Sequence, residues 1–204
     1  AVVPELIDLG RWRELLAENP REPTPGRFTV LCVCRLYRRK RIGLLLGAAA
    51  RLRGHIPELE VRIVGEGPEA AEFKQIWREK RLEGTVRFLG DVSRARLAAE
   101  YNGCHVFCLP SVQEGFGIVF LEAMAAGKPV VAVRAAAVPE VVPQGLLADP
   151  ESEQSIAASI ESLYRDAGLR ASLVAAGLER VEQFDAPRVA RLFLEAAARA
   201  IRLE

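Results

Sequence analysis

The sequence predicts an α/β fold built on a doubly wound, mostly parallel β-sheet. From Arg27 to the end of the chain, short apolar runs of strand length alternate with longer segments of helical periodicity. The first of these runs, FTVLCVC at 28–34, is apolar almost throughout, which is typical of parallel strands covered by helices on both faces. Half of the 204 residues are hydrophobic and 27% are charged. The chain can therefore bury a sizeable core, and disorder is not expected.

Six strands and the helices between them are expected in chain order. The strands are expected at 28–34, 59–65, 85–90, 105–110, 129–133 and 145–149, the last of them short. Helices are expected at 41–53, 68–81 and 93–101, and in three C-terminal segments at 152–165, 169–183 and 187–202. This alternation predicts one Rossmann-like domain over residues 27–204.

Residues 1–26 are expected to form a lead-in or interdomain linker segment ahead of that domain. Asp8 is a candidate N-cap for a short helix through Ala17, which carries large apolar residues at helical spacing. The next ten residues, ENPREPTPGR, include three prolines and a glycine, a composition typical of linkers. The chain opens at Ala1 without a Met, so we expect it to be part of a longer protein.

Charge and cysteine usage restrict the function classes. Lys and Arg total 28 against 27 Asp and Glu, a net charge of +1, whereas proteins devoted to nucleic acid usually carry a basic excess. No apolar run of about 18 residues occurs, so no transmembrane segment is expected. The four cysteines are interpreted as small buried thiols, with a metal or disulfide joining Cys32, Cys34 and Cys108 as the alternative. Reduced thiols favour a cytoplasmic protein.

Ligands of a doubly wound sheet bind beyond the carboxyl ends of its strands. Four loops that follow predicted strands, at 35–40, 65–68, 90–92 and 110–117, are therefore expected to converge on one crevice. The only histidines, His55 and His105, lie outside these loops and are not expected to be catalytic.

The first of these loops is basic. Arg35 directly follows its strand and Lys40 lies near the start of the next helix, so both could neutralise a diphosphate and stabilise it as it leaves. The alternative is a solvated basic corner. The second loop, GEGPEA at 65–70, matches a dinucleotide fingerprint but follows the second strand rather than the first. A glycine turn lining the crevice is the preferred interpretation.

Residues 110–127, PSVQEGFGIVFLEAMAAG, hold two glutamates, Glu114 and Glu122, on either side of a Gly-Phe-Gly turn. After the turn, every residue from Ile118 to Ala126 is apolar or small except Glu122. A helix that is apolar all round is normally buried, and an unpaired carboxylate buried in it is costly. Glu122 is therefore expected to have a partner, and nothing nearby in the sequence supplies one.

A bound nucleotide would provide partners both for Glu122 and for the start of this helix. One carboxylate can accept two hydrogen bonds from a vicinal diol such as that of ribose. Free N–H groups and the positive dipole end at the start of the helix suit a phosphate. The two glutamates could also form a glycosidase acid/base pair, but their placement around a phosphate-binding turn favours hydroxyl recognition.

Several motifs now identify a resemblance. The chain resembles the C-terminal, donor-binding half of the retaining, GT-B-fold glycosyltransferases of family 4 (glycosyl transferases group 1). The match runs from about Val3 to the end. It includes, in order, CRLYRRK, IVGEGP, VRFLGDV, VFCLPSVQEGFGIVFLEAMAAGKPVVA and VPEVV. The element in which two glutamates flank seven residues and AMAAGKPVV follows is highly specific, whereas the other motifs are weak individually and strong jointly.

The resemblance implies roles for the site residues. Arg35 and Lys40 would grip the diphosphate of a UDP-, GDP- or ADP-linked sugar, and Glu114 would hold hydroxyls of the transferred sugar near its reacting carbon. Glu122 would bind the ribose, and the loop ending at Val92 would contact the base through its backbone. The remaining donor-binding residues would be Gly115, Phe116, Gly117, Ile118 and Val119. No metal or other cofactor is implied.

The resemblance also implies a partner. The N-terminal half of such enzymes holds the acceptor, and we expect it to be absent from this chain, so that the fragment alone would be inactive. Location would be cytoplasmic, or peripheral at the inner membrane through that absent half. The last helix is amphipathic and is expected to dock on this or a neighbouring domain, with membrane binding as the alternative.

The chain departs from the family at positions where glycine is usual. Cys34 precedes the arginine, Arg41 follows the lysine, and Ala135-Ala136 replaces a glycine pair after the fifth strand. Three other functions stay open: a sugar-phosphate-forming synthase or phosphorylase of the same fold, a dinucleotide-dependent oxidoreductase, and a non-catalytic binding module.

Overall fold

A six-stranded sheet forms the centre of the computed structural model, which describes residues 3–201. Its strands are β1 (Phe28–Val33), β2 (Leu59–Val64), β3 (Val86–Gly90), β4 (Val106–Leu109), β5 (Val130–Val133) and β6 (Leu146–Ala148). All neighbours pair in parallel, in the order β3-β2-β1-β4-β5-β6. The predicted doubly wound fold is confirmed, with the switch in strand order between β1 and β4.

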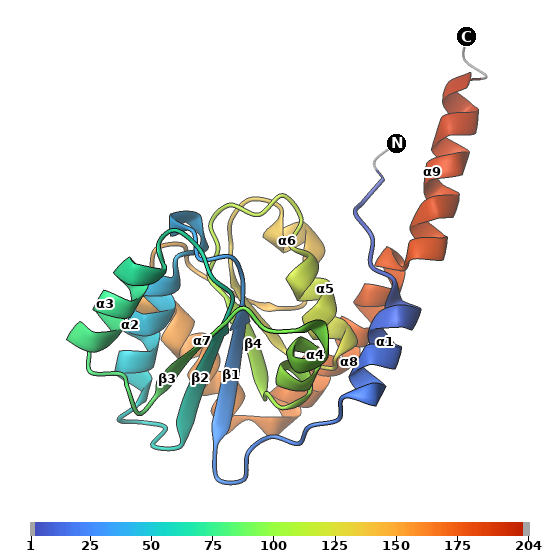
Figure 1. The fold of residues 1–204 in the computed structure, drawn as a ribbon. Coiled ribbons are helices and arrows are strands. Elements are labelled where there is room, and N and C mark those ends of the chain that lie inside the picture. The colour runs from blue at the N-terminus through green and yellow to red at the C-terminus, as the bar shows by residue number, and fades with distance from the viewer. Residues whose placement is uncertain (1–2, 202–204) are drawn as a thin grey trace.

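Helices cover both faces of the sheet (Figure 1). Their bounds are α1 (Leu9–Glu18), α2 (Ile42–Leu52), α3 (Ala70–Glu79), α4 (Arg94–Asn102), α5 (Ile118–Ala125), α6 (Val138–Val141), α7 (Glu153–Arg165), α8 (Ala167–Val181) and α9 (Ala186–Ile201). Helix α2 packs on both α3 and α7, whereas α1 packs on α4 and α5, and α8 packs on α5. Every predicted helix is present, and the predicted end of the last one at residue 202 lies outside the described residues. The short α6 and two 3-10 turns, at Arg38–Lys40 and Glu182–Phe184, were not predicted, because one turn is too short to show a helical period.

The lead-in segment packs closely on the domain through α1. The Asp8 side chain accepts a hydrogen bond from the Arg11 amide (2.9 Å), so the predicted N-cap is confirmed. Trp12 is 2% exposed, contacts the Tyr101 ring edge-on (5.5 Å between ring centroids) and donates its indole N–H to the Glu122 carbonyl (3.1 Å). Helix α1 is thereby attached to α4 and α5. The boundary between a linker at 1–26 and a domain at 27–204 stays a prediction.

The cysteines lie in the apolar interior. All four are buried with free thiols, and burial raises the pKa of Cys104 and of Cys108 to about 12. A thiol with such a pKa stays protonated near neutral pH, so these two residues behave as small apolar side chains. The interpretation as buried thiols is confirmed.

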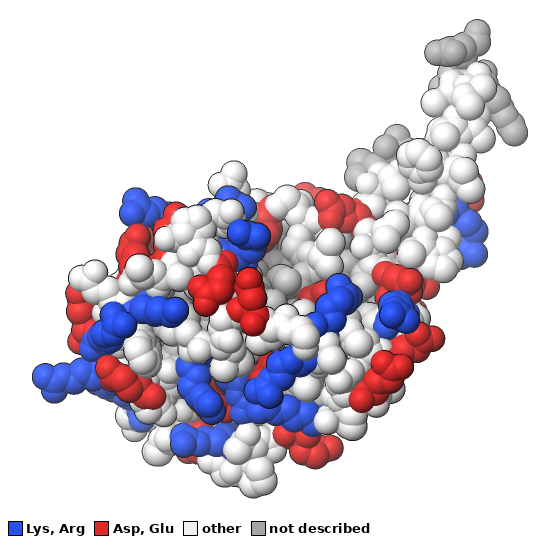
Figure 2. Space-filling model, viewed as in Figure 1, with Lys and Arg blue, Asp and Glu red and all other residues white. Residues whose placement is uncertain are grey.

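The final helix, α9, projects away from the domain (Figure 1). Val189 is its one buried residue among those described, whereas Leu192, Phe193 and Leu194 are 41–65% exposed. Figure 2 shows the projecting part covered mainly by uncharged residues, while charges of both signs are spread over the rest of this face. The predicted amphipathic helix is present, but most of its apolar face does not dock on this domain.

Two of the positions that depart from the usual glycine have a left-handed backbone. Arg41 has φ 51° and Ala136 has φ 47°, a region that costs an L-residue about 1–2 kcal/mol. Arg41 forms an ion pair with Glu151 (2.7 Å), which itself has φ 60°. Since Ala136 is exposed and has only a methyl group, it has no comparable compensation.

We expect Ala136→Gly to stabilise the chain by about 0.5–1 kcal/mol, because relief of the left-handed strain exceeds the entropy cost of glycine. Urea unfolding of the variant measures this change. Ala137→Gly is the matched control: its φ is −77°, so the same substitution should destabilise by about 0.5–1 kcal/mol. Equal destabilisation by both variants would contradict the strain argument.

Candidate functional site

Two cavities meet at the start of α5, beyond the carboxyl ends of β1 and β4. The first cavity has a volume of about 410 Å³ and is lined by Glu5, Val33, Cys34, Arg35, Tyr37, Arg39, Lys40, Glu114, Gly115, Phe116, Gly117, Ile118 and Val119. It therefore contains every predicted site residue except Val92 and Glu122. Of the four loops expected to converge on one crevice, those at 35–40 and 110–117 line this cavity.

The two loops are joined by both backbone and side chains. The amide of Val112 and the hydroxyl of Ser111 donate to the carbonyl of Arg39 (3.1 and 3.3 Å). Lys40 forms an ion pair with Glu114, and these side chains are only 13% and 9% exposed. A pair so little exposed is weakly screened by salt. An incoming anion would therefore compete directly with Glu114 for Lys40.

The turn before α5 requires glycine. Gly117 has φ 88°, and a Cβ built on it would lie 2.6 Å from Cδ2 of Phe120. The first N–H groups of α5, including those of Ile118 and Val119, lack intrahelical partners and lie at the positive end of the helix dipole. Both residues line the first cavity together with three cationic side chains. The geometry suits a bound phosphate or diphosphate.

Glu122 opens on the second cavity, which has a volume of about 200 Å³. This cavity is lined by Leu6, Ile7, Asp8, Arg11, Trp12, Arg94, Ile118 and Glu122. Ile118 is 44% exposed and lines both cavities, so it separates the cationic cavity from the one containing Glu122. The two predicted binding functions thus lie on opposite sides of one apolar side chain.

The Glu122 carboxylate has a partner that the sequence analysis missed. The hydroxyl of Tyr101 in α4 donates to Oε2 of Glu122 (3.0 Å), so the expected partner exists and lies 21 positions away in the sequence. Burial raises the pKa of Glu122, while the Tyr101 hydrogen bond and the positive charge of Arg94 oppose this rise. Among residues 3–201, no Lys, Arg or His nitrogen lies within the 4.0 Å ion-pair distance of this carboxylate.

Other predicted site features lie elsewhere. Val92 lines neither cavity. The glycines of the 65–68 loop do not line them either: a Cβ on Gly65 would lie 2.0 Å from the carbonyl oxygen of Cys34, and one on Gly67 would lie 2.4 Å from that of Leu36. These glycines let the second loop pack against the first. The expected crevice-lining turn is therefore a support for the Arg35 loop.

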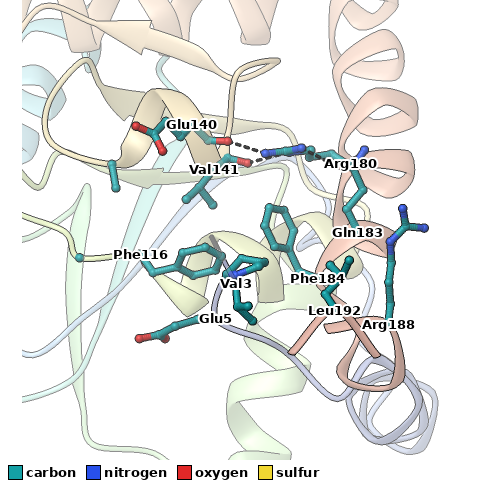
Figure 3. A pocket seen from close by; sticks show the side chains of 13 residues that line it. Val3, Glu5, Phe116, Glu140, Val141, Arg180, Gln183, Phe184, Arg188 and Leu192 are labelled. Atoms are coloured by element: carbon teal, nitrogen blue, oxygen red, sulfur yellow. Dashed lines mark hydrogen bonds between the residues drawn. The ribbon is translucent and has the colours of Figure 1, made fainter. Parts of the chain in front are cut away.

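A third cavity of about 620 Å³ adjoins the first at Gly115 and Phe116 and extends to the base of α9 (Figure 3). The ring of Phe116 contacts that of Phe184 edge-on, with centroids 5.2 Å apart. Arg180 donates to the carbonyls of Glu140 and Val141 and thereby ties α8 to α6 (Figure 3). Leu192 of α9 also lines this cavity, so the exposed face of α9 continues into it.

Within the described part of the chain, no three His, Cys, Asp or Glu side chains are grouped as metal ligands. Metal-free chemistry stays a prediction. His105, at the start of β4, accepts a hydrogen bond at Nδ1 from the Thr29 amide (3.0 Å), and burial lowers its pKa. None of the described helices has the length and apolar character needed to cross a membrane.

Comparison with characterised proteins identifies relatives. Residues 17–180 match the family described as "Glycosyl transferases group 1". The chain is 36% identical over 190 residues to the phosphatidyl-myo-inositol mannosyltransferase of Mycolicibacterium smegmatis, covering 90% of this chain and 47% of that protein. It is 30% identical to the D-inositol 3-phosphate glycosyltransferase of Pseudarthrobacter chlorophenolicus, with coverage of 95% and 49%. The chain thus spans about half the length of the curated relatives it matches.

Solved structures share the fold. Sucrose-phosphate synthase of Thermosynechococcus elongatus superposes with a TM-score of 0.82 at 28% identity, covering 100% of this chain and 53% of that one. Anabaena HepE, in a complex with UDP and glucose, superposes with a TM-score of 0.78 at 26% identity, covering 94% and 52%. By sequence and by architecture, this chain belongs to the glycosyl transferases group 1 family.

Proposed function

We propose that this chain is the donor-binding half of a retaining glycosyltransferase of family 4. It would bind a nucleoside-diphosphate sugar and transfer the sugar to an acceptor held by a preceding N-terminal half. The family match supports this function, as do relatives named as mannosyl- and glycosyltransferases. The complex of HepE with UDP and glucose supports the donor class.

One observation carries the proposal. A carboxylate and a group of cations occupy neighbouring cavities on the two sides of Ile118, at the switch point of the sheet. Burial raises the pKa of Glu122, yet among the described residues only the hydroxyl group of Tyr101 hydrogen-bonds to its carboxylate. A ribose diol at Glu122 and a diphosphate at Lys40 and the start of α5 would satisfy both cavities with one ligand.

The chemistry follows from these positions. When the glycosidic bond to the diphosphate breaks, negative charge grows on the leaving phosphate oxygen. Arg35, Lys40 and the N–H groups at the start of α5 would stabilise that charge. Glu114 would accept hydrogen bonds from the sugar hydroxyls once the diphosphate has taken its place at Lys40. The chain's own cations would then supply the leaving-group stabilisation, with no metal ion required.

A second candidate is a synthase that transfers the sugar to a phosphosugar acceptor. The superposition with a sucrose-phosphate synthase favours keeping this candidate. Assays of the longer protein with phosphate, phosphosugar and unphosphorylated acceptors would separate it from the first. A dinucleotide-dependent oxidoreductase is disfavoured. The glycines of GEGPEA pack against the Arg35 loop, so they do not form a turn that could hold a dinucleotide.

We propose that α9 and the third cavity receive the acceptor-binding half. The apolar face of α9 is exposed and continues through Leu192 into a cavity beside the donor turn. The chain spans about half the length of its curated relatives, which leaves room for such a partner. A cytoplasmic location, or a peripheral one at the inner membrane through that half, is part of the same proposal.

A thermal-shift and calorimetric screen against UDP, GDP, ADP and their sugar conjugates tests donor binding, because a ligand of the folded form raises its melting temperature. Glu122→Gln should weaken binding of the ligand found by about 1–3 kcal/mol. The same variant should melt higher than wild type without ligand. The raised pKa of Glu122 means that the fold disfavours its charged form, and glutamine removes that charge.

Glu195→Gln, on the exposed polar side of α9, is the control and should change neither quantity. Unchanged binding in Glu122→Gln would contradict the ribose assignment.

Glu114→Gln should have opposite effects on the two contributions to donor binding, that of the nucleotide and that of the sugar. Removal of the carboxylate frees Lys40, so a bare nucleoside diphosphate should bind more tightly than to wild type. The additional affinity that the sugar confers should fall by about 1.5 kcal/mol, as for a lost hydrogen bond to a charged group. Calorimetric titration with matched pairs, such as UDP and UDP-glucose, measures both. Equal weakening of both ligands would refute the sugar-binding role of Glu114, and Lys40→Met, which should weaken both, is the comparison.

Phe193→Ser with Leu194→Ser should leave the melting temperature of this chain nearly unchanged, because both side chains are exposed. In the longer protein the same changes should lower transferase activity and increase hydrogen exchange in α9. Val189→Ser is the matched control. This residue is 3% exposed, so its substitution should destabilise the isolated chain by about 2 kcal/mol. Full activity of the double variant would argue against this interface.

A further inference from the structure

A cationic side chain faces the second cavity and has no role in the function proposed so far. Arg94, the first residue of α4, lines this cavity with Glu122. Its guanidinium carbon lies 6.0 Å from the centroid of the Trp12 ring, a cation–π distance. Within residues 3–201, no carboxylate oxygen lies within 4.0 Å of its guanidinium nitrogens. Its hydrogen-bond donors are therefore available to a ligand.

The position of Arg94 relative to a nucleotide follows from the two cavities, and this step rests on the proposed function. With the diphosphate in the first cavity and the ribose at Glu122, Ile118 lies beneath their junction. The phosphate and the base leave the ribose from different carbons, C5′ and C1′, on opposite sides of the diol. Arg94 and Trp12 line the cavity of Glu122 and not that of Lys40, so a base directed away from the diphosphate would lie near them.

The chemistry of arginine restricts which base fits. A guanidinium has five N–H donors and no acceptor. Uracil presents carbonyl oxygens, and guanine presents O6 beside N7, a pair that arginine binds with two hydrogen bonds. Adenine presents an amino group at the corresponding carbon, and its N–H groups would oppose those of the guanidinium. We propose that Arg94 is a specificity-determining residue that selects a donor with a keto base, uracil or guanine, over adenine.

Asp8 and Arg11 also line this cavity. Oδ1 of Asp8 is engaged by the amide of Arg11 as the cap of α1, and the Arg11 guanidinium lies 4.0 Å from Glu14 on an exposed surface. Both groups are thus already used by α1. A simpler role for Arg94 is to balance the charge of Glu122, because its positive charge opposes the rise in that residue's pKa. The two roles predict different effects on different nucleotides.

The test is calorimetric titration of this chain with UDP, GDP and ADP, repeated on Arg94→Gln and on Arg94→Lys. The wild type should bind UDP or GDP at least about tenfold more tightly than ADP, the lower part of the range for a two-hydrogen-bond contact between arginine and a base. Arg94→Gln should remove this preference and leave the ADP affinity unchanged. Arg94→Lys should retain part of the preference, because it keeps the charge but loses the two-pronged geometry.

Arg96→Gln is the matched control. Arg96 lies two positions further along α4, and its guanidinium is paired with Glu100 (2.6 Å), so its loss should leave the preference intact. Equal weakening of all three ligands by Arg94→Gln would overturn the proposal and assign Arg94 to the support of Glu122. Equal affinity of the wild type for ADP, UDP and GDP would also overturn the proposal for Arg94, but it would leave the proposed donor binding intact. No binding of any of the three would overturn the proposed function itself.

Discussion

The adjacency of β1 and β4 is the constraint on which the site depends. Because the chain runs outward from β1 to β3 and then returns to β4, helices leave these two neighbours toward opposite faces of the sheet, and the loops after them meet. Hydrogen bonds from Ser111 and Val112 to the carbonyl of Arg39 join the loops. Lys40 and Glu114, 74 positions apart, are neighbours for this reason.

The helix that follows holds a carboxylate at an energetic disadvantage. Burial raises the pKa of Glu122, so the free protein is less stable with this group charged than it would be with a neutral one. Tyr101 binds the carboxylate, and Trp12 binds the carbonyl of the same residue. These aromatic residues come from α4 and α1, so the segment expected to be a lead-in helps to fix the position of Glu122. Such a group is a strong acceptor for a ligand that brings its own donors.

The sequence predicted the repeating elements well because their signals are local. A continuous apolar run located β1, all of whose residues are buried, and Asp8 caps its helix as expected. The contacts that define the site are not local. From the sequence, Tyr101 can only be placed in a helix. That it is a partner of Glu122 depends on the tertiary packing of α4 against α5. The left-handed backbone at Arg41 and Ala136 does not follow from these residue types, and the one sequence signal for it is that the family usually has glycine at both positions. The placement of Val92 outside both cavities has the same cause: loop direction depends on tertiary contacts.

The ion pair between Lys40 and Glu114 gives the site a coupling that neither residue has alone. In the free protein each neutralises the other in a nearly dry environment. An unpaired charge there would be costly, so the pair keeps the free site stable while no ligand is bound. A diphosphate that takes over Lys40 leaves the Glu114 carboxylate in need of new donors at the place where the sugar hydroxyls arrive. Binding of the phosphates would thus create the acceptor for the sugar, and an intact donor would satisfy both charges, whereas a nucleotide without its sugar would satisfy only one. The site would then distinguish an intact donor from the nucleoside diphosphate left after transfer through one shared ion pair, rather than through separate pockets.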